Sequence, residues 1–164
     1  MATITAKTTI EATPERVWEV LSDFGGISQA APHLTGSRLT GAEDGGVGAS
    51  RHCDLSMPGV STEEVITRWE VNQGYGVDID MKGMPVRDGH AEFEIDTVDG
   101  RTVLTGVMSY AMPFGPIGAA IDKVASRKMA SMWSGMLAGF KARAEDGVRV
   151  DADSGLPTSA VELL

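Results

Sequence analysis

Arg51 and Glu63 are charged residues whose spacing places them among apolar side chains, so they are the first candidates for chemistry. Arg51 lies two residues before Cys53, in a segment that alternates like a β-strand. Glu63 lies two residues before Val65 in the next such segment. Because residues i and i+2 of a strand share a face, both charges are predicted to point inward, and antiparallel pairing would bring them together.

Such a pair has two interpretations. It either braces the sheet as a buried or rim ion pair, or it serves a ligand. In the second case the pair orients a ligand hydroxyl or carboxylate, or one of its groups acts as a general acid or base with a pKa shifted by burial. The residues alone leave both interpretations open.

Two further side chains complete the catalytic candidates. His90 begins a strand-like segment beside a predicted loop, from which it would reach the mouth of a pocket. Tyr110 would donate a hydrogen bond to a bound carbonyl. The catalytic candidates are therefore Glu63, Arg51, Tyr110 and His90.

The sequence contains no motif that is typical of a metal site or a cofactor site. His33, His52 and His90 lack the spacing of metal ligands, and we expect no metal site. The chain also lacks a Ser-His-Asp order, a phosphate-binding glycine loop and a dinucleotide fingerprint, and we expect no cofactor. Cys53 is interpreted as a small buried residue.

Composition narrows the class of protein. The 164 residues fit one domain. A formal charge of −9 and an isoelectric point of about 4.7 argue against nucleic acid and against anionic membrane surfaces as partners. A single cysteine excludes an internal disulfide, and we see no signal peptide and no membrane-spanning run. The cytoplasm is the expected compartment.

The elements that would position these residues follow a simple order. Residues 3–10 alternate as a strand, and Thr13 with Pro14 predicts the start of a helix, followed by a short helical piece over 27–31. Six more strands are predicted from alternation and turn residues. They are Thr35–Gly41, Gly48–Ser56, Ser61–Val71, Tyr75–Met81, Gly89–Val98 and Arg101–Met112.

A long helix is predicted over about 116–144. Its apolar residues recur at steps of three and four and form one face. They are Ile117, Ile121, Val124, Ala125, Met129, Met132, Trp133, Met136 and Phe140. The acidic stretch 145–164 lacks a period and is expected to be a loose tail whose removal is nearly neutral, with docking of its last residues, Ala160–Leu164, as the alternative.

Three local patterns, together with this order, resemble the helix-grip superfamily of START domains, Bet v 1-like allergens and polyketide cyclases, also called SRPBCC proteins. The patterns are Ile10–Asp23, Val47–Arg51 and Ser61–Val65, and the resemblance covers about 3–144. It implies an α+β fold in which a seven-stranded antiparallel curved sheet wraps around a long C-terminal helix, with two short helices after the first strand. It also implies a ligand cavity between sheet and helix, and similarity to the superfamily's hormone receptors implies that Glu63 lines it.

Alternation predicts which residues would face that cavity. Val65 and Trp69 set the inward face of their strand, which places Ser61 and Glu63 inward as well. The predicted lining from the strands is Arg51, Cys53, Leu55, Ser61, Glu63, Val65, Tyr75, Val77, Ile79, Met81, Phe93, Leu104, Met108, Tyr110 and Met112. The predicted lining from the helix is Met129, Met132, Trp133 and Met136.

The resemblance supplies the function class. It implies binding of a small, largely apolar molecule, aromatic or polyketide-like. The alternative is an enzyme of the polyketide cyclase/dehydratase type, a lyase or isomerase using the same cavity. A third interpretation is a regulatory module whose loops Met57–Gly59 and Gly83–Pro85 frame the cavity mouth and contact a second copy or a partner protein.

Overall fold

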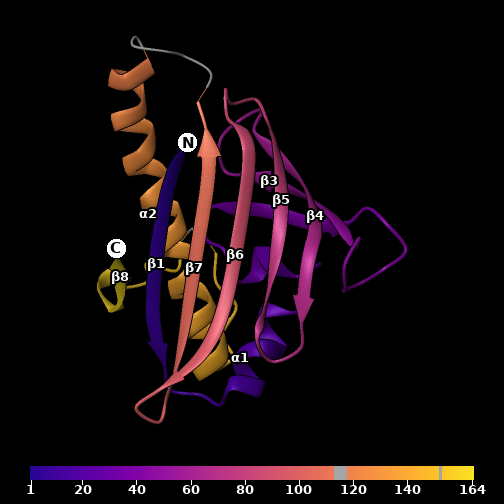
Figure 1. Ribbon diagram of the computed structural model, residues 1–164, viewed down its shortest axis with the longest axis vertical. Coiled ribbons are helices and arrows are strands. Elements are labelled where there is room, and N and C mark those ends of the chain that lie inside the picture. The colour runs from indigo at the N-terminus through magenta and orange to yellow at the C-terminus, as the bar shows by residue number, and fades with distance from the viewer. Residues whose placement is uncertain (113–117, 152) are drawn as a thin grey trace.

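The computed structural model describes the backbone of residues 1–112, 118–151 and 153–164, and the side chains of the same residues except 118–125. In this part of the chain eight strands form one antiparallel sheet in the order β2-β3-β4-β5-β6-β7-β1-β8 (Figure 1). The strands are β1 Ala2–Ile10, β2 Leu34–Leu39, β3 Ser50–Leu55, β4 Ser61–Glu70, β5 Gly74–Lys82, β6 Arg87–Val98, β7 Arg101–Ala111 and β8 Val161–Leu163. The helices are α1 Pro14–Leu21, η1 Ile27–Gln29, α2 Gly118–Asp146 and η2 Thr158–Ala160.

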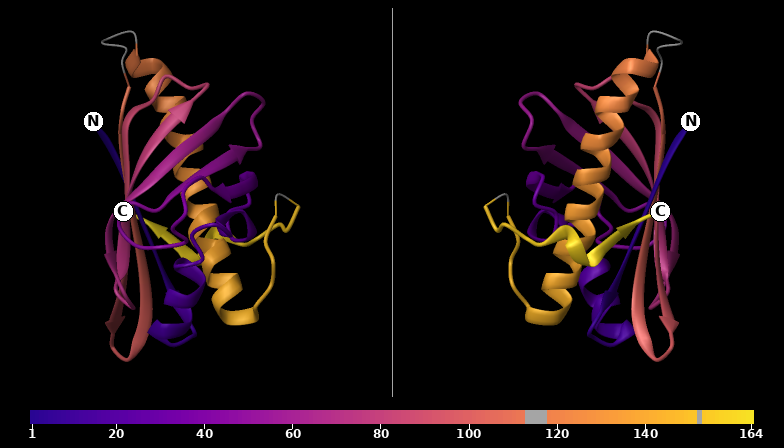
Figure 2. Two further views of the ribbon diagram at one scale, coloured as in Figure 1. Left: turned by 90° about the vertical axis from the view of Figure 1, so that its right-hand side faces the viewer. Right: turned by 90° about the vertical axis from the view of Figure 1, so that its left-hand side faces the viewer.

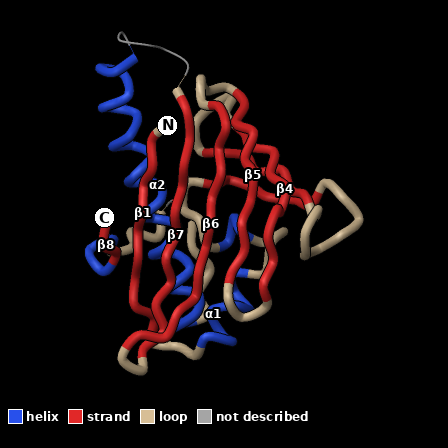
Figure 3. The backbone as a smooth tube through the Cα atoms, viewed as in Figure 1, coloured by secondary structure: helices blue, strands red, loops and turns tan. Residues whose placement is uncertain are grey.

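The start of α1 and the hairpin between β6 and β7 form at the residues that the sequence predicts. The Thr13 side chain accepts a hydrogen bond from the Arg16 backbone N–H at 3.2 Å, and Pro14 opens α1. Asp99 and Gly100 have φ angles of 50° and 75° and join β6 to β7 in a two-residue hairpin. Figure 3 shows these strands as the red segments of the backbone, joined by tan loops.

The helix α2 crosses one face of the sheet, which Figure 2 shows edge-on, and packs on β1, β7 and α1. Two glycines permit close approaches of α2, one to the sheet and one to the segment after η1. A Cβ on Gly106 of β7 would lie 3.0 Å from the ring of Trp133, and one on Gly139 of α2 would lie 1.6 Å from the Ala30 carbonyl oxygen. Trp133 Nε1 also donates to the Gly106 carbonyl at 3.0 Å, which fixes helix and sheet together.

The predicted apolar face of the long helix is confirmed where it is described. Met129, Trp133, Met136 and Phe140 are buried, and Met132 is half-buried. The side chains of Ile117, Ile121, Val124 and Ala125 lie outside the described residues. None of the helices in the described ranges is both long and apolar enough to span a membrane.

The sheet has one strand more than the seven expected, and it comes from the predicted tail. β8 pairs antiparallel with β1, where the Thr8 hydroxyl donates to the Ala160 carbonyl at 2.9 Å. Val150 is 1% exposed, and its N–H donates to the Gln29 carbonyl at 2.8 Å. The expectation of a loose tail is therefore wrong for these residues, because β8 pairs with the edge strand β1 and the backbone of Val150 bonds to Gln29.

A β-bulge changes which residues of β4 face inward. The pairing of β4 with β5 shifts between Ile66 and Arg68, so one extra residue separates the two halves of the strand. Trp69 packs inward against Trp18, whereas Val65 is 43% exposed. An odd insertion reverses the alternation, and a face assigned from Trp69 is therefore inverted before the bulge.

The prediction that Ser61, Glu63 and Val65 point inward is thus wrong. The inward residues of this half of β4 are Thr62, Glu64 and Ile66, all of which are buried.

Candidate functional site

Arg51 does pair with a glutamate inside the protein, but the partner is Glu64. The Arg51 and Glu64 side chains are only 3% and 9% exposed. Arg51 Nε donates to Glu64 Oε2 at 2.8 Å, and Nη2 donates to the same oxygen. The other carboxylate oxygen, Oε1, accepts a hydrogen bond from the Thr62 hydroxyl at 2.8 Å.

The remaining contacts of Arg51 hold it in place. Its Nη1 donates to the Phe24 carbonyl at 2.9 Å, and the guanidinium carbon lies 4.0 Å from the centroid of the Phe24 ring. Burial is the largest single effect on the pKa of Arg51 and lowers it, but the charge of Glu64, together with smaller effects of Tyr75, Cys53 and the hydrogen bond with Glu64, raises the pKa above its ordinary value. Glu64 is therefore the counter-ion of Arg51 inside the protein.

Glu63 lies on the opposite, outer face of the sheet. Its side chain is 46% exposed and contacts His52, whose other ring nitrogen lies 3.0 Å from Asp54 Oδ1. Hydrogen bonds with Glu63 and then Asp54 raise the pKa of His52. The predicted contact between Glu63 and Arg51 is wrong, because the two side chains leave the sheet on different faces.

His90 is likewise on the outer face and does not reach the inner cavity. Its Nδ1 lies 2.7 Å from Asp78 Oδ1 and its Nε2 lies 2.9 Å from Glu92 Oε1. Burial lowers the pKa of His90, but hydrogen bonds with Asp78 and Glu92 outweigh it and leave the pKa raised. The predicted position at the pocket mouth is wrong.

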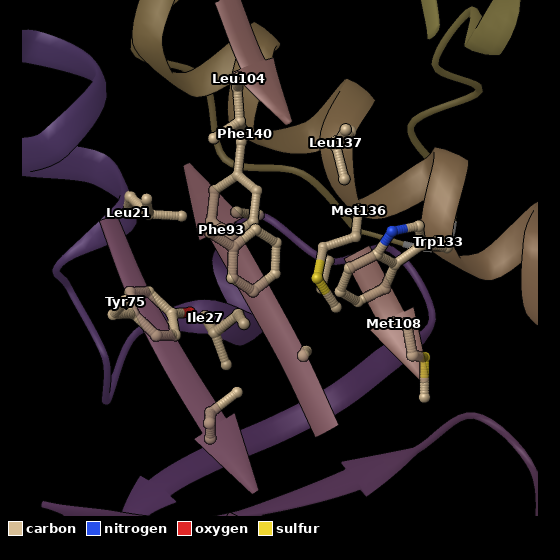
Figure 4. Close-up of a cluster of buried hydrophobic side chains, with 14 of the residues drawn as sticks. Leu21, Ile27, Tyr75, Phe93, Leu104, Met108, Trp133, Met136, Leu137 and Phe140 are labelled. Carbon is tan, nitrogen blue, oxygen red and sulfur yellow. The ribbon is translucent and has the colours of Figure 1, made fainter. Parts of the chain in front are cut away.

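A cavity lies between the inner face of the sheet and α2. Its volume is about 50 Å³, counted as the space that the centre of a water molecule can occupy. It is lined by Ile27, His33, Leu34, Arg51, Leu55, Thr62, Glu64, Val77, Ile79, Met81, Ala91, Phe93, Met108, Met129, Met132, Trp133 and Met136. In Figure 4, Trp133 and Met136 project from α2 towards the strands that carry Phe93 and Met108.

The structure sorts the predicted lining residues into three groups. Those that line the cavity are Arg51, Leu55, Val77, Ile79, Met81, Phe93, Met108, Met129, Met132, Trp133 and Met136. Those that are buried or half-buried in the core away from the lining are Cys53, Tyr75, Leu104, Tyr110 and Met112. Those on the outer face are Ser61, Glu63 and Val65.

Aromatic packing explains why the inward-pointing Tyr75 does not line the cavity. Its ring centroid lies 5.9 Å from that of Trp69 and 5.2 Å from that of Phe93. The Tyr75 ring therefore packs behind Phe93, which lines the cavity. Cys53 is also fully buried, and burial followed by the charge of Glu64 raises the pKa of its thiol to about 12, so it is not a nucleophile here.

His33 is a further polar lining residue that the sequence pattern missed, besides Thr62 and Glu64. It lies between η1 and β2, its ring lines the cavity, and its Nδ1 atom is buried with no hydrogen-bonding partner among the residues described. Burial lowers the pKa of His33 to about 4, against an opposing effect of the Glu64 charge. The imidazole is therefore neutral near pH 7, and no periodicity in its loop signals that it enters the core.

The arrangement offers hydrogen bonding in an otherwise apolar space, and it offers no metal site. Within the described ranges no group of three or more His, Cys, Asp or Glu side chains could hold a metal ion. The polar residues of the lining are Arg51 on β3, Thr62 and Glu64 on β4, and His33 directly before β2.

Comparisons with known proteins agree with this fold. Residues 1–145 match the family model described as "Polyketide cyclase / dehydrase and lipid transport". The comparison with curated protein sequences finds no significant match.

Many solved structures are similar to the chain, among them the following three. TTHA0849 from Thermus thermophilus aligns with a TM-score of 0.74 and 16% identity over 87% of this chain and 97% of that one. Ara h 8.0201 aligns with a TM-score of 0.63 and 10% identity over 85% and 97%. The Aha1 dimer from Colwellia psychrerythraea aligns with a TM-score of 0.63 and 18% identity over 90% and 98%. At these identities the likeness shows the shared fold.

Proposed function

The chain belongs to the polyketide cyclase / dehydrase and lipid transport family, and on that premise we propose that it binds a small, largely apolar molecule in the cavity between the sheet and α2. The observation that carries the proposal is the lining itself. Aliphatic, aromatic and methionine side chains make up most of it, and the few polar groups are gathered around the Arg51–Glu64 pair. Pockets for small organic molecules combine an apolar wall with a few polar groups in this way.

The size of the cavity limits the ligand. Its volume of about 50 Å³ is well below the roughly 300–1,000 Å³ of pockets that hold drug-sized molecules. Met129, Met132 and Met136 line it from the helix side, and unbranched methionine side chains adapt to a bound shape more readily than branched ones. We therefore expect either a one-ring ligand or a larger one that displaces these methionines.

A variant that fills the cavity tests the proposal. Ala91 on β6 is 1% exposed and lines the cavity, so Ala91→Leu would place three more carbon atoms in the ligand space. Ala2→Leu adds the same atoms at a half-buried position on β1 outside the lining, and it serves as the matched control.

The measurement is native mass spectrometry of the purified protein, followed by titration with one-ring aromatic compounds. We expect a retained or added small molecule on the unmodified protein and on Ala2→Leu, and its loss on Ala91→Leu. Equal binding by all three proteins would refute the cavity as the site.

The enzyme alternative uses the same cavity, and one observation favours a particular residue for it. A proton acceptor must be unprotonated at the working pH, and the lowered pKa of His33 keeps its imidazole neutral inside the lining. A dehydration or cyclisation step would then depend on His33, and replacing it with Gln would abolish turnover of a polyketide-like substrate while leaving binding of a small apolar molecule in place.

A further inference from the structure

We propose that the cavity selects an uncharged ligand with one hydroxyl group, phenolic or alcoholic, and that Glu64 and His33 together bind this hydroxyl. The inference rests on the binding function proposed above and names the chemical class of its ligand. It is carried by the charge balance of the cavity, by its unused hydrogen-bonding groups and by their position at one end of the lining.

The charges of the lining are already balanced. Arg51 and Glu64 compensate each other through two hydrogen bonds, and the third donor group of Arg51 is occupied by the Phe24 carbonyl. A carboxylate ligand would bring a second negative charge next to Glu64, and a cation would lie next to Arg51. Either charge would lose its hydration without gaining a free counter-ion, so a neutral ligand is favoured.

The unused hydrogen-bonding groups match a hydroxyl. Glu64 Oε1 accepts one hydrogen bond, from Thr62, and a carboxylate oxygen can accept a second. His33 is neutral and offers one donor and one acceptor nitrogen, of which Nδ1 is without a partner among the described residues. A ligand hydroxyl both donates and accepts, so it can donate to the carboxylate and accept from the imidazole.

Two other polar side chains of the lining already use their donor hydrogens within the protein. The indole N–H of Trp133 already donates to the Gly106 carbonyl at 3.0 Å, and the Thr62 hydroxyl donates to Glu64. Met129, Met132 and Met136 supply the helix side of the lining. The hydroxyl of the ligand is therefore placed against β4 and the loop before β2, and its apolar body against α2.

Three one-ring compounds of nearly equal shape test the inference on the unmodified protein. They are p-xylene, p-cresol and p-toluate, which carry a methyl, a hydroxyl and a carboxylate at the same ring position. Titration calorimetry at pH 7 would measure their dissociation constants. We expect p-cresol to bind roughly tenfold or more tightly than p-xylene, because a hydrogen bond to a charged group favours it, and p-toluate to bind most weakly.

A pair of histidine variants assigns the preference to the cavity. His33→Phe keeps a planar ring and removes its hydrogen bonding, so we expect p-cresol to lose most of its advantage while the affinity for p-xylene is kept. His52→Phe makes the same change on the outer face, where His52 contacts Glu63, and we expect it to leave the ligand order unchanged.

Each outcome decides between the two proposals. Equal affinities for p-cresol and p-xylene, tightest binding of p-toluate, or an unchanged p-cresol preference in folded His33→Phe would overturn the hydroxyl inference and leave the apolar binding function standing. Failure of all three compounds to bind the unmodified protein, with no molecule retained on purification, would overturn both. If His33→Phe does not fold, the ligand order on the unmodified protein still decides the inference.

Discussion

Removing the Glu64 carboxylate should destabilise the protein far more than removing the carboxylate next to it. In Glu64→Ala the Arg51 guanidinium stays buried, at 2% residue exposure, and loses both hydrogen bonds from Nε and Nη2. Breaking a buried pair by removing one partner costs about 3–5 kcal/mol of unfolding free energy. Arg51 keeps the Phe24 carbonyl and ring, so we expect the lower end, about 3 kcal/mol.

The adjacent Glu63 offers a matched control. Glu63→Ala removes the same side chain one residue earlier on β4, but from the outer face, where Glu63 is 46% exposed and water replaces its contact with His52. Urea denaturation followed by circular dichroism would compare the two variants. A slope of about 1–3 kcal/mol/M converts the predicted loss for Glu64→Ala into a midpoint lower by roughly 1–3 M, whereas Glu63→Ala should stay close to the unmodified protein.

A double replacement separates the charge effect from lost packing. Arg51→Met combined with Glu64→Leu removes both charges and keeps side-chain volume, so it should recover most of the stability that Glu64→Ala loses. The reasoning would be refuted if Glu64→Ala and Glu63→Ala were equally destabilising, or if the double variant were no more stable than Glu64→Ala.

Three further predictions concern pH, thiol reactivity and the C-terminal segment. The folded-state pKa of His33 is lowered from 6.5 to about 4, so between these pH values the unfolded chain binds a proton that the folded protein does not. The free energy of unfolding should therefore fall by at most about 3 kcal/mol as the pH falls from 6.5 to 4. Urea midpoints of His33→Phe should lack this part of the decrease. The raised pKa of His52 acts in the opposite sense, since its contribution is fully present below pH 6.5 and is lost as pH rises through the raised value. The Cys53 thiol, with its pKa raised to about 12, should react with a disulfide reagent at pH 8 only after denaturant is added; fast reaction of the folded protein would contradict its burial. Ending the chain at Asp146 removes Val150, which is 1% exposed, and leaves β1 without its partner β8. We expect a melting temperature lower by roughly 5 °C, whereas removing only the exposed Leu164 should have little effect. An unchanged melting temperature after the longer truncation would show that the docked segment is dispensable.

The loops Met57–Gly59 and Gly83–Pro85 remain a prediction as the frame of the cavity mouth. They lie against each other, since a Cβ on Gly83 would come within 2.1 Å of the Gly59 carbonyl oxygen. None of their residues lines the cavity in the described part of the chain. Hydrogen exchange with and without p-cresol would test a gating role, which equal protection of both loops would contradict.

Local patterns in the sequence were enough to predict the order of the elements from β1 to α2. Alternation of apolar and polar residues marks the strands β1 to β7, Thr13 and Pro14 start α1, and Asp99-Gly100 closes a hairpin, all through interactions within a few residues. The face of α2 that covers the sheet follows from its period in the same way. Arg51 was placed correctly because β3 is regular from end to end.

Contacts between distant segments decided the site. The bulge near Ile66 depends on how β4 fits β5, so no local pattern indicated that Glu64, rather than Glu63, would face Arg51. His33 enters the lining from a loop without a period, and β8 pairs with β1, which lies at the opposite end of the chain. Register, loop path and edge pairing are set by packing free energies summed over the whole fold, and a one-residue change in register moves every side chain of a strand to the other face.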